Sequence, residues 1–327
     1  MKFAVFGTGG VGGYFGGKLA HAGNEVWFLA RGAHLAAMRA RGLHVRSTDG
    51  EFILPHRTMT GDPRDAGPVD VVLFCVKSYD TETAARQLSP LLQPATVVIS
   101  LQNGVDNEEK IRAVTTSGIV FGGVAYIYST ITAPGEITET GGPKKIVFGP
   151  LGAAPEAVER RAREILDTMT GAGIRAELSS DINTALWKKF IFITGAGGIT
   201  ALTRLTLGEI LAVEETRTLL ADAMRETEAV ARAEKARIEP GFIDGVFATL
   251  RNFDNNTRSS LYYDLTHEKP MEVEALSGTV IRLGARHGIP TPTHKAIYAS
   301  LLPYHLKHSR ELQATNVSPH AHSKETP

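Results

Sequence analysis

The chain opens with MKFAVFGTGGVG, residues 1–12, and much of its fold follows from this segment. Residues 2–6 form a short apolar run that predicts a strand, and the glycine-rich turn after it leads into a helical pattern as far as residue 20. A second apolar run over residues 25–30 predicts the next strand. Strand, glycine turn, helix and strand form the context in which a G-x-G-x-x-G pattern indicates a dinucleotide site.

Each glycine of the pattern has a physical task. Gly7 allows a tight turn out of the strand, Gly9 lets the backbone approach a pyrophosphate, and Gly12 lets helix and strand pack closely. The pyrophosphate is expected at the helix N-terminus, where free N–H groups and the helix dipole favour negative charge. An ordinary flexible turn is the alternative for a bare glycine match. The predicted cofactor-binding residues of the turn are Gly7, Thr8, Gly9, Gly10, Val11 and Gly12.

The residue after the second strand indicates which dinucleotide binds. An NAD site usually places Asp or Glu there to bind the ribose 2′-hydroxyl, whereas this chain has Arg31. A carboxylate would repel a 2′-phosphate, and a guanidinium can hold it through a charge-assisted, bidentate contact. We therefore expect NADPH/NADP as the cofactor. The alternative is that Arg31 is a solvated loop residue.

Length and composition indicate an ordinary globular protein with about two domains. The chain has 327 residues, of which 43% are apolar and 21% are charged. Lys plus Arg and Asp plus Glu each number 35, so a formal net charge of zero leaves no basic field for nucleic acid. The longest uncharged stretch, residues 190–203, is shorter than the ~20 residues of a membrane span. We expect a cytoplasmic protein with no membrane or nucleic-acid partner.

Neither cysteine nor histidine chemistry is expected. Cys75 is the only cysteine, and its apolar neighbours predict a buried packing residue. The 11 histidines show no ligand spacing supported by a carboxylate or a cysteine, so no metal site is predicted.

Strands and helices alternate over the first 180 residues. Strands are predicted at 69–76, 96–101, 119–124, 146–148 and 174–178, helices at 34–41, 81–92 and 156–169, and a small hairpin at 43–45 and 52–54 around Asp49-Gly50. This alternation predicts a doubly wound, mostly parallel sheet, in which ligands bind beyond the carboxyl ends of the strands. Arg31, Lys77 and Asn103 all lie at such ends.

The fold class is therefore α/β plus all-α. Residues 1–180 are expected to form a Rossmann-like, NADP-binding domain, and the helical pattern of residues 181–313 predicts a substrate or catalytic domain. Residues 314–327 are poor in apolar side chains and are expected to be a disordered tail.

Taken together, several motifs resemble those of the 2-dehydropantoate 2-reductases, or ketopantoate reductases, over nearly the whole chain. They are the glycine turn, Arg31, Val76-Lys77, Gln102-Asn103-Gly104, Trp187-Lys188-Lys189 and Ser259-Ser260 with Glu272. The resemblance implies a Rossmann domain, a helical domain and an active site between them. It also implies NADPH-dependent reduction of ketopantoate to pantoate, for pantothenate and coenzyme A synthesis, and a homodimer as an expectation.

The resemblance also assigns roles. Its tryptophan-x-lysine pattern makes Lys189, rather than Lys188, the expected general acid, and only one of the two can face the cleft because adjacent helical residues point about 100° apart. Lysine suits this role because hydride delivery to a carbonyl leaves an alkoxide that needs a proton. Glu272 is expected to be its partner carboxylate, or a hydroxyl-binding neighbour, beside the cofactor. Asn103 would orient nicotinamide and substrate, Lys77 would lie near the cofactor, and Ser260 would hold the substrate. Without the resemblance, all of these could be surface, turn or helix-start residues.

One departure from the family pattern affects the substrate. Ile193, Gly197 and Leu207 stand where the family usually has asparagine. Ile193 and Gly197 lie four and eight residues after Lys189, so they share its helix face and should line the pocket. A site that lacks partners for polar substrate groups discriminates against them, so a more apolar 2-oxo acid is an alternative substrate. The glycines at 195, 197 and 198 could widen that pocket or serve close helix packing. A non-catalytic NADP(H)-binding sensor is the alternative from another class.

Overall fold

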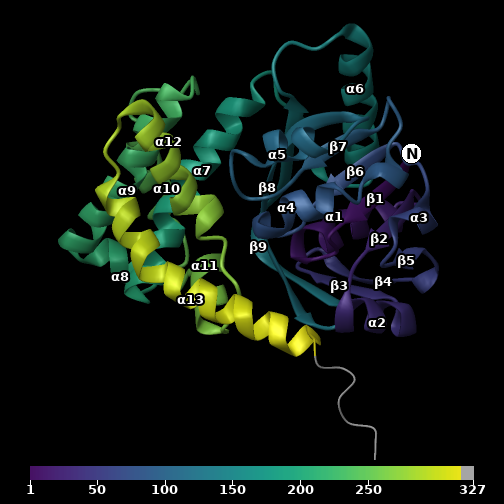
Figure 1. Cartoon of the computed structure of the whole chain (residues 1–327), viewed down its shortest axis with the longest axis horizontal. Coiled ribbons are helices and arrows are strands. Elements are labelled where there is room, and N and C mark those ends of the chain that lie inside the picture. Colours follow the sequence, from purple (N-terminus) through teal and green to yellow (C-terminus); the bar gives the residue numbers. More distant parts are fainter. Residues whose placement is uncertain (318–327) are drawn as a thin grey trace, which may run out of the picture. The chain divides into compact units, whose positions relative to one another are not determined.

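The computed structural model describes the backbone of residues 1–317 and the side chains through residue 311. The chain divides into two compact units, Met1–Leu186 and a second that begins at Trp187. Strands occur in the first unit, whereas the described regular elements of the second are helices, as Figure 1 shows. The predicted α/β plus all-α class is confirmed.

The first unit is built on one ten-stranded sheet. Its strand order is β4-β3-β9-β8-β7-β6-β1-β2-β5, and β10 pairs with β9. All neighbouring pairs are parallel except β3–β4 and β8–β9. The strands are β1 (Lys2–Phe6), β2 (Glu25–Leu29), β3 (Leu43–Ser47), β4 (Gly50–Leu54), β5 (Met59–Thr60), β6 (Val71–Phe74), β7 (Val97–Ser100), β8 (Ile119–Ala133), β9 (Glu136–Pro150) and β10 (Arg175–Leu178).

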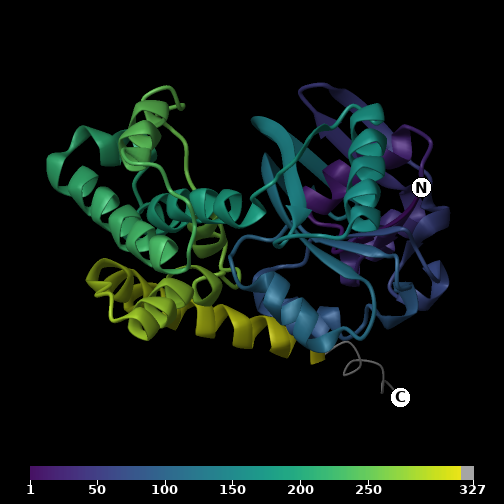
Figure 2. The ribbon, with the colours of Figure 1, turned by 90° about the horizontal axis from the view of Figure 1, so that it is seen from above.

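Helices cover both faces of this sheet, which confirms the doubly wound arrangement. One core contains Phe15 and Leu19 of α1 (Gly10–His21) with Ile165 of α6 (Glu156–Gly171). The core on the other face contains Ala84 and Ile111. These two come from α4 (Thr81–Ala85) and α5 (Asn107–Val114), and α3 (Pro63–Ala66) contributes to the same core. Figure 2 shows α6 on one side of the strands and the blue helices α4 and α5 on the other.

The largest difference from the sequence prediction is the β8–β9 hairpin. Strands were expected at 119–124 and 146–148, but each strand is 15 residues long and the two are joined at Pro134 and Gly135. The outer parts escaped prediction because they contain many polar residues together with Gly and Pro, and because register shifts near Tyr126 and Tyr128 interrupt the alternation. The extended hairpin packs on α1, so the sheet curls around that helix.

The small hairpin of β3 and β4 is confirmed, with Leu43 opposite Leu54. It joins the main sheet, because β3 pairs in parallel with β9. The helix expected at 81–92 is shorter than predicted: α4 ends at Ala85, and a separate 3-10 turn covers Ser89–Leu91. Pro90 lies in that turn and has no N–H to continue a helix.

The second unit is helical. Its elements are α7 (Ile182–Thr203), which begins in the first unit, α8 (Leu207–Ala212), α9 (Glu214–Ala233), α10 (Phe242–Leu250), α11 (Ser260–Thr266), a π-helical segment (Glu274–Gly278), α12 (Thr279–His287) and α13 (Pro292–Val317). Helix α13 extends to Val317 and so includes residues 314–317 of the stretch that the sequence predicts as a tail. The rest of that expected tail lies outside the described residues. No helix in the described part combines the length and the apolar character that crossing a bilayer requires.

Candidate functional site

The glycine turn between β1 and α1 has the geometry expected of a phosphate-binding turn. Gly7 has φ +100°, and an added Cβ would lie 2.8 Å from the Val76 nitrogen. At Gly12 an added Cβ would lie 2.4 Å from the Gly7 oxygen, so helix and turn touch there. At Gly9 an added Cβ would meet nothing within 4 Å. Each of the three glycines therefore has a distinct reason to lack a side chain.

The N-terminus of α1 fits an anionic group. No side chain caps this end, and the first turn carries no acidic residue, so its backbone N–H groups keep their full preference for negative charge. The turn itself is fixed to the end of β2, because the Thr8 hydroxyl donates a hydrogen bond to the Leu29 carbonyl at 3.0 Å. Open space beside Gly9 and uncapped donors on α1 together suit a dinucleotide pyrophosphate.

Position 10, the fourth glycine of this region, must lack a side chain for a reason that the sequence did not reveal. An added Cβ would lie 2.2 Å from the carbonyl oxygen of Ser129 on β8. Gly13 is similarly close to the Ile137 side chain on β9, at 2.6 Å. These two glycines let the long hairpin rest on α1, and nothing local to the turn could have indicated this.

Arg31 lies where the sequence predicts, directly after β2 at the N-terminus of α2 (Gly32–Arg41). Its side chain is 82% exposed and forms an ion pair with Asp80, whose side chain is 28% exposed. Asp80 follows β6, and its backbone N–H donates to the Lys77 carbonyl at 2.9 Å. Sequence reasoning missed Asp80, since no pattern links it to a residue 49 positions away.

Lys77 and Asn103 lie at the carboxyl ends of β6 and β7, as predicted, and a buried amide network joins their loops. The Gln102 side chain donates to the Val76 carbonyl at 2.9 Å and to the Thr81 hydroxyl at 2.8 Å. The Asn107 side chain donates to the Asn103 carbonyl at 3.0 Å. This network holds both loops at the edge of the sheet that also carries the glycine turn and Arg31.

In the helical unit, α7 carries Lys189, and Glu272 precedes the π-helical segment. Glu272 is buried and Lys189 is partly buried. Burial lowers the pKa of Lys189 to about 8, while the negative charge of Glu272 acts in the opposite direction and raises it. A lysine with a pKa near 8 can hold a proton at neutral pH and release it readily. Such a shifted group beside a carboxylate is a candidate catalytic pair.

The neighbouring Lys188 points elsewhere. Its ammonium group pairs with the Glu239 carboxylate at 2.6 Å and lies 5.7 Å from the centre of the Phe242 ring. The two adjacent lysines therefore serve different surroundings, in agreement with the choice of Lys189 as the candidate acid.

The two serines at the start of α11 also differ. Ser259 is the helix cap: its hydroxyl oxygen accepts the Tyr262 N–H at 3.0 Å and the Thr200 hydroxyl at 2.6 Å. Ser260 is the first residue of the helix and is exposed. Ser259 is thus a structural residue, whereas Ser260 is accessible at the surface.

The glycine run of α7 combines two kinds of position. Added Cβ atoms at Gly195 and Gly198 would lie 2.7 Å from side chains of α9 and α13, respectively, so close helix packing explains both glycines. At Gly197 the nearest atom would be the Leu261 Cβ at 3.9 Å, an ordinary contact. Packing therefore does not require glycine at 197. Ile193 is partly buried on the same helix, and Leu207 is buried at the start of α8.

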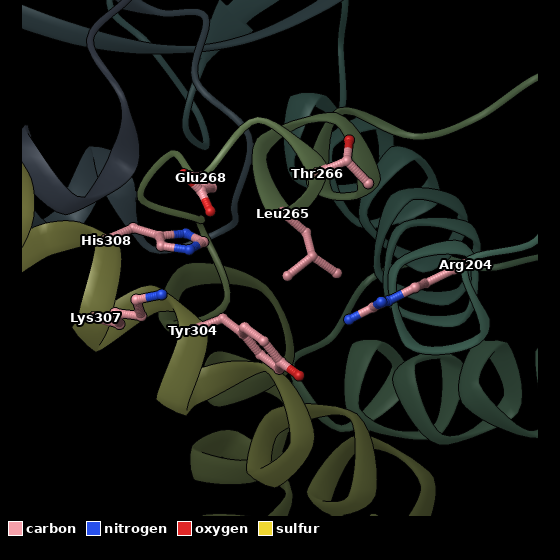
Figure 3. A pocket seen from close by; sticks show the side chains of 7 residues that line it. All are labelled: Arg204, Leu265, Thr266, Glu268, Tyr304, Lys307 and His308. Atoms are coloured by element: carbon pink, nitrogen blue, oxygen red, sulfur yellow. The ribbon is translucent and has the colours of Figure 1, made fainter.

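A separate pocket of about 320 Å³ lies at the far end of α7. In Figure 3 the side chains of Arg204, Leu265 and Tyr304 point toward one another across it. The predicted site residues are not among those that line it, and Arg204 follows the last turn of α7 whereas Lys189 lies in the first half of this helix.

Within residues 1–311, no three His, Cys, Asp or Glu side chains are grouped so that they could hold a metal ion. Cys75 is a free thiol that packs beside Gly12, and burial raises its pKa. A protonated, partly buried thiol is a poor nucleophile.

Comparisons with known proteins agree with this geometry. Two family models match, one described as ketopantoate reductase PanE/ApbA over residues 3–153 and the other as its C-terminal part over residues 181–305. The chain is 32% identical over 322 residues to a 2-dehydropantoate 2-reductase from Mesorhizobium japonicum, covering 91% of this chain and 96% of the relative. It is 30% identical over 304 residues to an uncharacterized oxidoreductase, YkpB, from Bacillus subtilis, covering 93% and 99%.

Solved structures give the same result. A PanE/ApbA family ketopantoate reductase from Ralstonia eutropha matches with a TM-score of 0.85 and 31% identity, covering 94% of this chain and 100% of that one. A D-mandelate dehydrogenase in complex with NADH and anilino(oxo)acetate matches with a TM-score of 0.84 at 21% identity, which shows a shared fold.

Proposed function

We propose that this chain, which belongs to the PanE/ApbA ketopantoate reductase family, uses NADPH to reduce the keto group of a 2-oxo acid, with 2-dehydropantoate as the leading substrate. The observation that carries this proposal is the pair formed by Lys189, with its pKa of about 8, and Glu272. We place the reaction in the cytoplasm, and a homodimer is part of the same proposal.

The cofactor is assigned from the sheet edge of the first unit. The glycine turn and the start of α1 would hold the pyrophosphate, and Arg31 with Lys77 would provide positive charge for a 2′-phosphate. Asn103, fixed by the amide network, would orient the nicotinamide and the substrate. Bound NADPH would supply the hydride.

The protein's own task is to handle the proton. Lys189 Nζ would carry a proton to the oxygen of the former keto group, where hydride transfer leaves negative charge. Glu272 favours the charged form of Lys189 and so helps to keep this general acid protonated at neutral pH. Ser260 would hold the carboxyl or hydroxyl end of the substrate.

A second candidate keeps the chemistry and changes the acid. Gly197 has room for a side chain and lacks one, and Ile193 presents an apolar side chain one turn after Lys189. Both replace amide groups that could pair with polar parts of a substrate, which favours a bulkier, more apolar 2-oxo acid.

The test is NADPH oxidation by the purified protein with 2-dehydropantoate and a panel of larger 2-oxo acids. The highest kcat/KM on 2-dehydropantoate supports the leading substrate, and a preference for a larger acid supports the second candidate. Tight NADPH binding without oxidation for any acid would favour the third reading, a non-catalytic NADP(H) sensor.

Two lysine variants make the test specific. Lys189→Met should lower kcat far more than it changes NADPH affinity. Lys188→Met is the matched control, because it removes the same charge from the adjacent position, and it should keep most of the activity. Equal losses in both variants would contradict the role of Lys189.

A further inference from the structure

We infer that Asp80 sets the cofactor preference, because its ion pair with Arg31 occupies the guanidinium that a 2′-phosphate would need. Asp80 thereby weakens NADPH binding and narrows the selectivity for NADPH over NADH. This inference rests on the proposed function, since it concerns the same dinucleotide site.

The position of the pair is the first argument. Arg31 follows β2 and Asp80 follows β6, and these strands flank β1 in the sheet. Because the three strands are parallel, the ion pair spans the carboxyl end of β1, where the glycine turn begins. The close approach of Gly7 to Val76 brings the loop after β6 down onto that turn. The carboxylate therefore lies within the predicted cofactor site and not on a remote surface.

The charges are the second argument. Asp80 places a negative charge directly beside Arg31, a cation predicted to face the 2′-position. A 2′-phosphate carries close to two negative charges at neutral pH. It must either displace the carboxylate from Arg31 or bind beside it against repulsion. NADH has a neutral 2′-hydroxyl, so it neither has to displace the carboxylate nor is repelled by it.

The third argument concerns what the sequence lacks. An acidic residue directly after β2 normally receives the ribose 2′-hydroxyl of NAD, and this chain has arginine there. The structure brings a carboxylate to the same place from the loop after β6. Asp80 can accept the hydrogen bond of a 2′-hydroxyl. The site therefore combines an arginine, as in NADP sites, with a carboxylate, as in NAD sites.

The experiment is calorimetric titration of the full-length protein and its Asp80→Asn variant with NADPH and with NADH. Asparagine keeps the size and an acceptor oxygen but removes the charge. We expect NADPH to bind about fivefold more tightly to the variant, which corresponds to ~1 kcal/mol, the upper range for an exposed ion pair. NADH affinity should change by less than about twofold, and added salt should narrow the NADPH difference.

Two further variants serve as controls. Asp222→Asn breaks another exposed arginine–aspartate pair, with Arg225 on α9, in which the arginine side chain is 63% exposed and the aspartate side chain 46%. It makes the same charge change within a helix of the second unit and should leave both affinities unchanged. In an Arg31→Ala background, Asp80→Asn should lose most of its effect on NADPH, because the two residues act through one contact.

The outcomes separate this inference from the proposed function. If the unaltered protein binds neither dinucleotide, both fail. If it binds NADPH but Asp80→Asn leaves the ratio of the two affinities unchanged, the inference fails and the function stands. Weaker NADPH binding in the variant would also overturn it, since Asp80 would then orient Arg31 for the phosphate. A full effect in the Arg31→Ala background would show that pairing is not the cause.

Discussion

Replacing Glu272 by glutamine should move the alkaline limit of the reduction to lower pH. The acid form of Lys189 is the reactive one, and its pKa of about 8 is the balance between burial, which lowers it, and the charge of Glu272, which raises it. Without that charge only the lowering effect remains. The pH above which kcat/KM falls should therefore decrease, whereas the reverse reaction, which needs neutral Lys189, should gain at the same pH values.

The size of the effect follows from the titration of one group. With a pKa of about 8, Lys189 is roughly 90% protonated at pH 7 and roughly 10% protonated at pH 9. An opposite charge near a titrating group changes its pKa by about 1 or more. In Glu272→Gln the lysine would then be half neutral by about pH 7, and kcat/KM at pH 8 would fall about fivefold from this cause alone.

The assay is the initial rate of NADPH oxidation between pH 6 and 10, analysed as kcat/KM. Glu274→Gln is the matched control, because Glu274 is an exposed carboxylate of the same segment that pairs with Arg282. Its alkaline limit should not move. If Glu272→Gln is too slow to profile, the Lys189 ammonium can be titrated directly by NMR, with Lys189→Met identifying its signal. An unchanged pKa of Lys189 in Glu272→Gln would contradict the proposed coupling.

Four further outcomes follow from the contacts described above. Gly9→Ala should fold normally, because its methyl group meets open space, and should weaken NADPH binding at least about tenfold by occupying the pyrophosphate side of the turn; unchanged binding would contradict the phosphate assignment. Arg31→Ala should weaken NADPH by ~1–3 kcal/mol and NADH little, and equal losses would disprove a 2′-phosphate contact. Gly198→Ala should lower the free energy of unfolding by ~1–3 kcal/mol, because its added carbon lies 2.7 Å from a side chain of α13. Gly197→Ala should raise the free energy of unfolding by as much as ~1 kcal/mol, because its added carbon lies 3.9 Å from the nearest atom. Urea unfolding of the two variants compares these values. Lys189→Met should raise the free energy of unfolding near neutral pH by ~1–2 kcal/mol, because the pKa of this lysine is 10.5 in the unfolded chain and about 8 in the native protein. The wild type should therefore become more stable as the pH rises between these two values. If the variant shows the same increase with pH, another group causes it.

The parts of the site that the sequence could predict are those set by local chemistry. The glycine turn and Arg31 were predictable because each depends only on its neighbours in the sequence. Gly7, with φ +100°, directly follows β1, and Arg31 comes shortly after β2. The β3–β4 hairpin was predictable from Asp49-Gly50. The choice of Lys189 over Lys188 came from the resemblance to the family pattern, and Lys188 pairs with Glu239 instead.

What the sequence did not show depends on contacts between distant segments. The full length of β8 and β9 depends on pairing with each other and on packing against α1, which no local alternation records. Asp80 reaches Arg31 only because two strand ends meet at one edge of the sheet. The meaning of the glycines in α7 depends on which neighbouring helix faces each of them: Gly195 and Gly198 meet α9 and α13, and Gly197 meets neither.

The hairpin that lies on α1 also sets an order of events during synthesis. Tyr14, Phe15 and Leu19 of α1 share a core with Ile137 and Ile146 of β9. A ribosome adds about 5–20 residues each second, so α1 leaves it roughly ten seconds before β9 is complete. During that interval the aromatic face of the helix is only partly covered by β1 and β2. The nascent β1–α1 segment should therefore be a preferred client of chaperones that bind apolar helices, until β9 is complete at residue 150 and covers the helix.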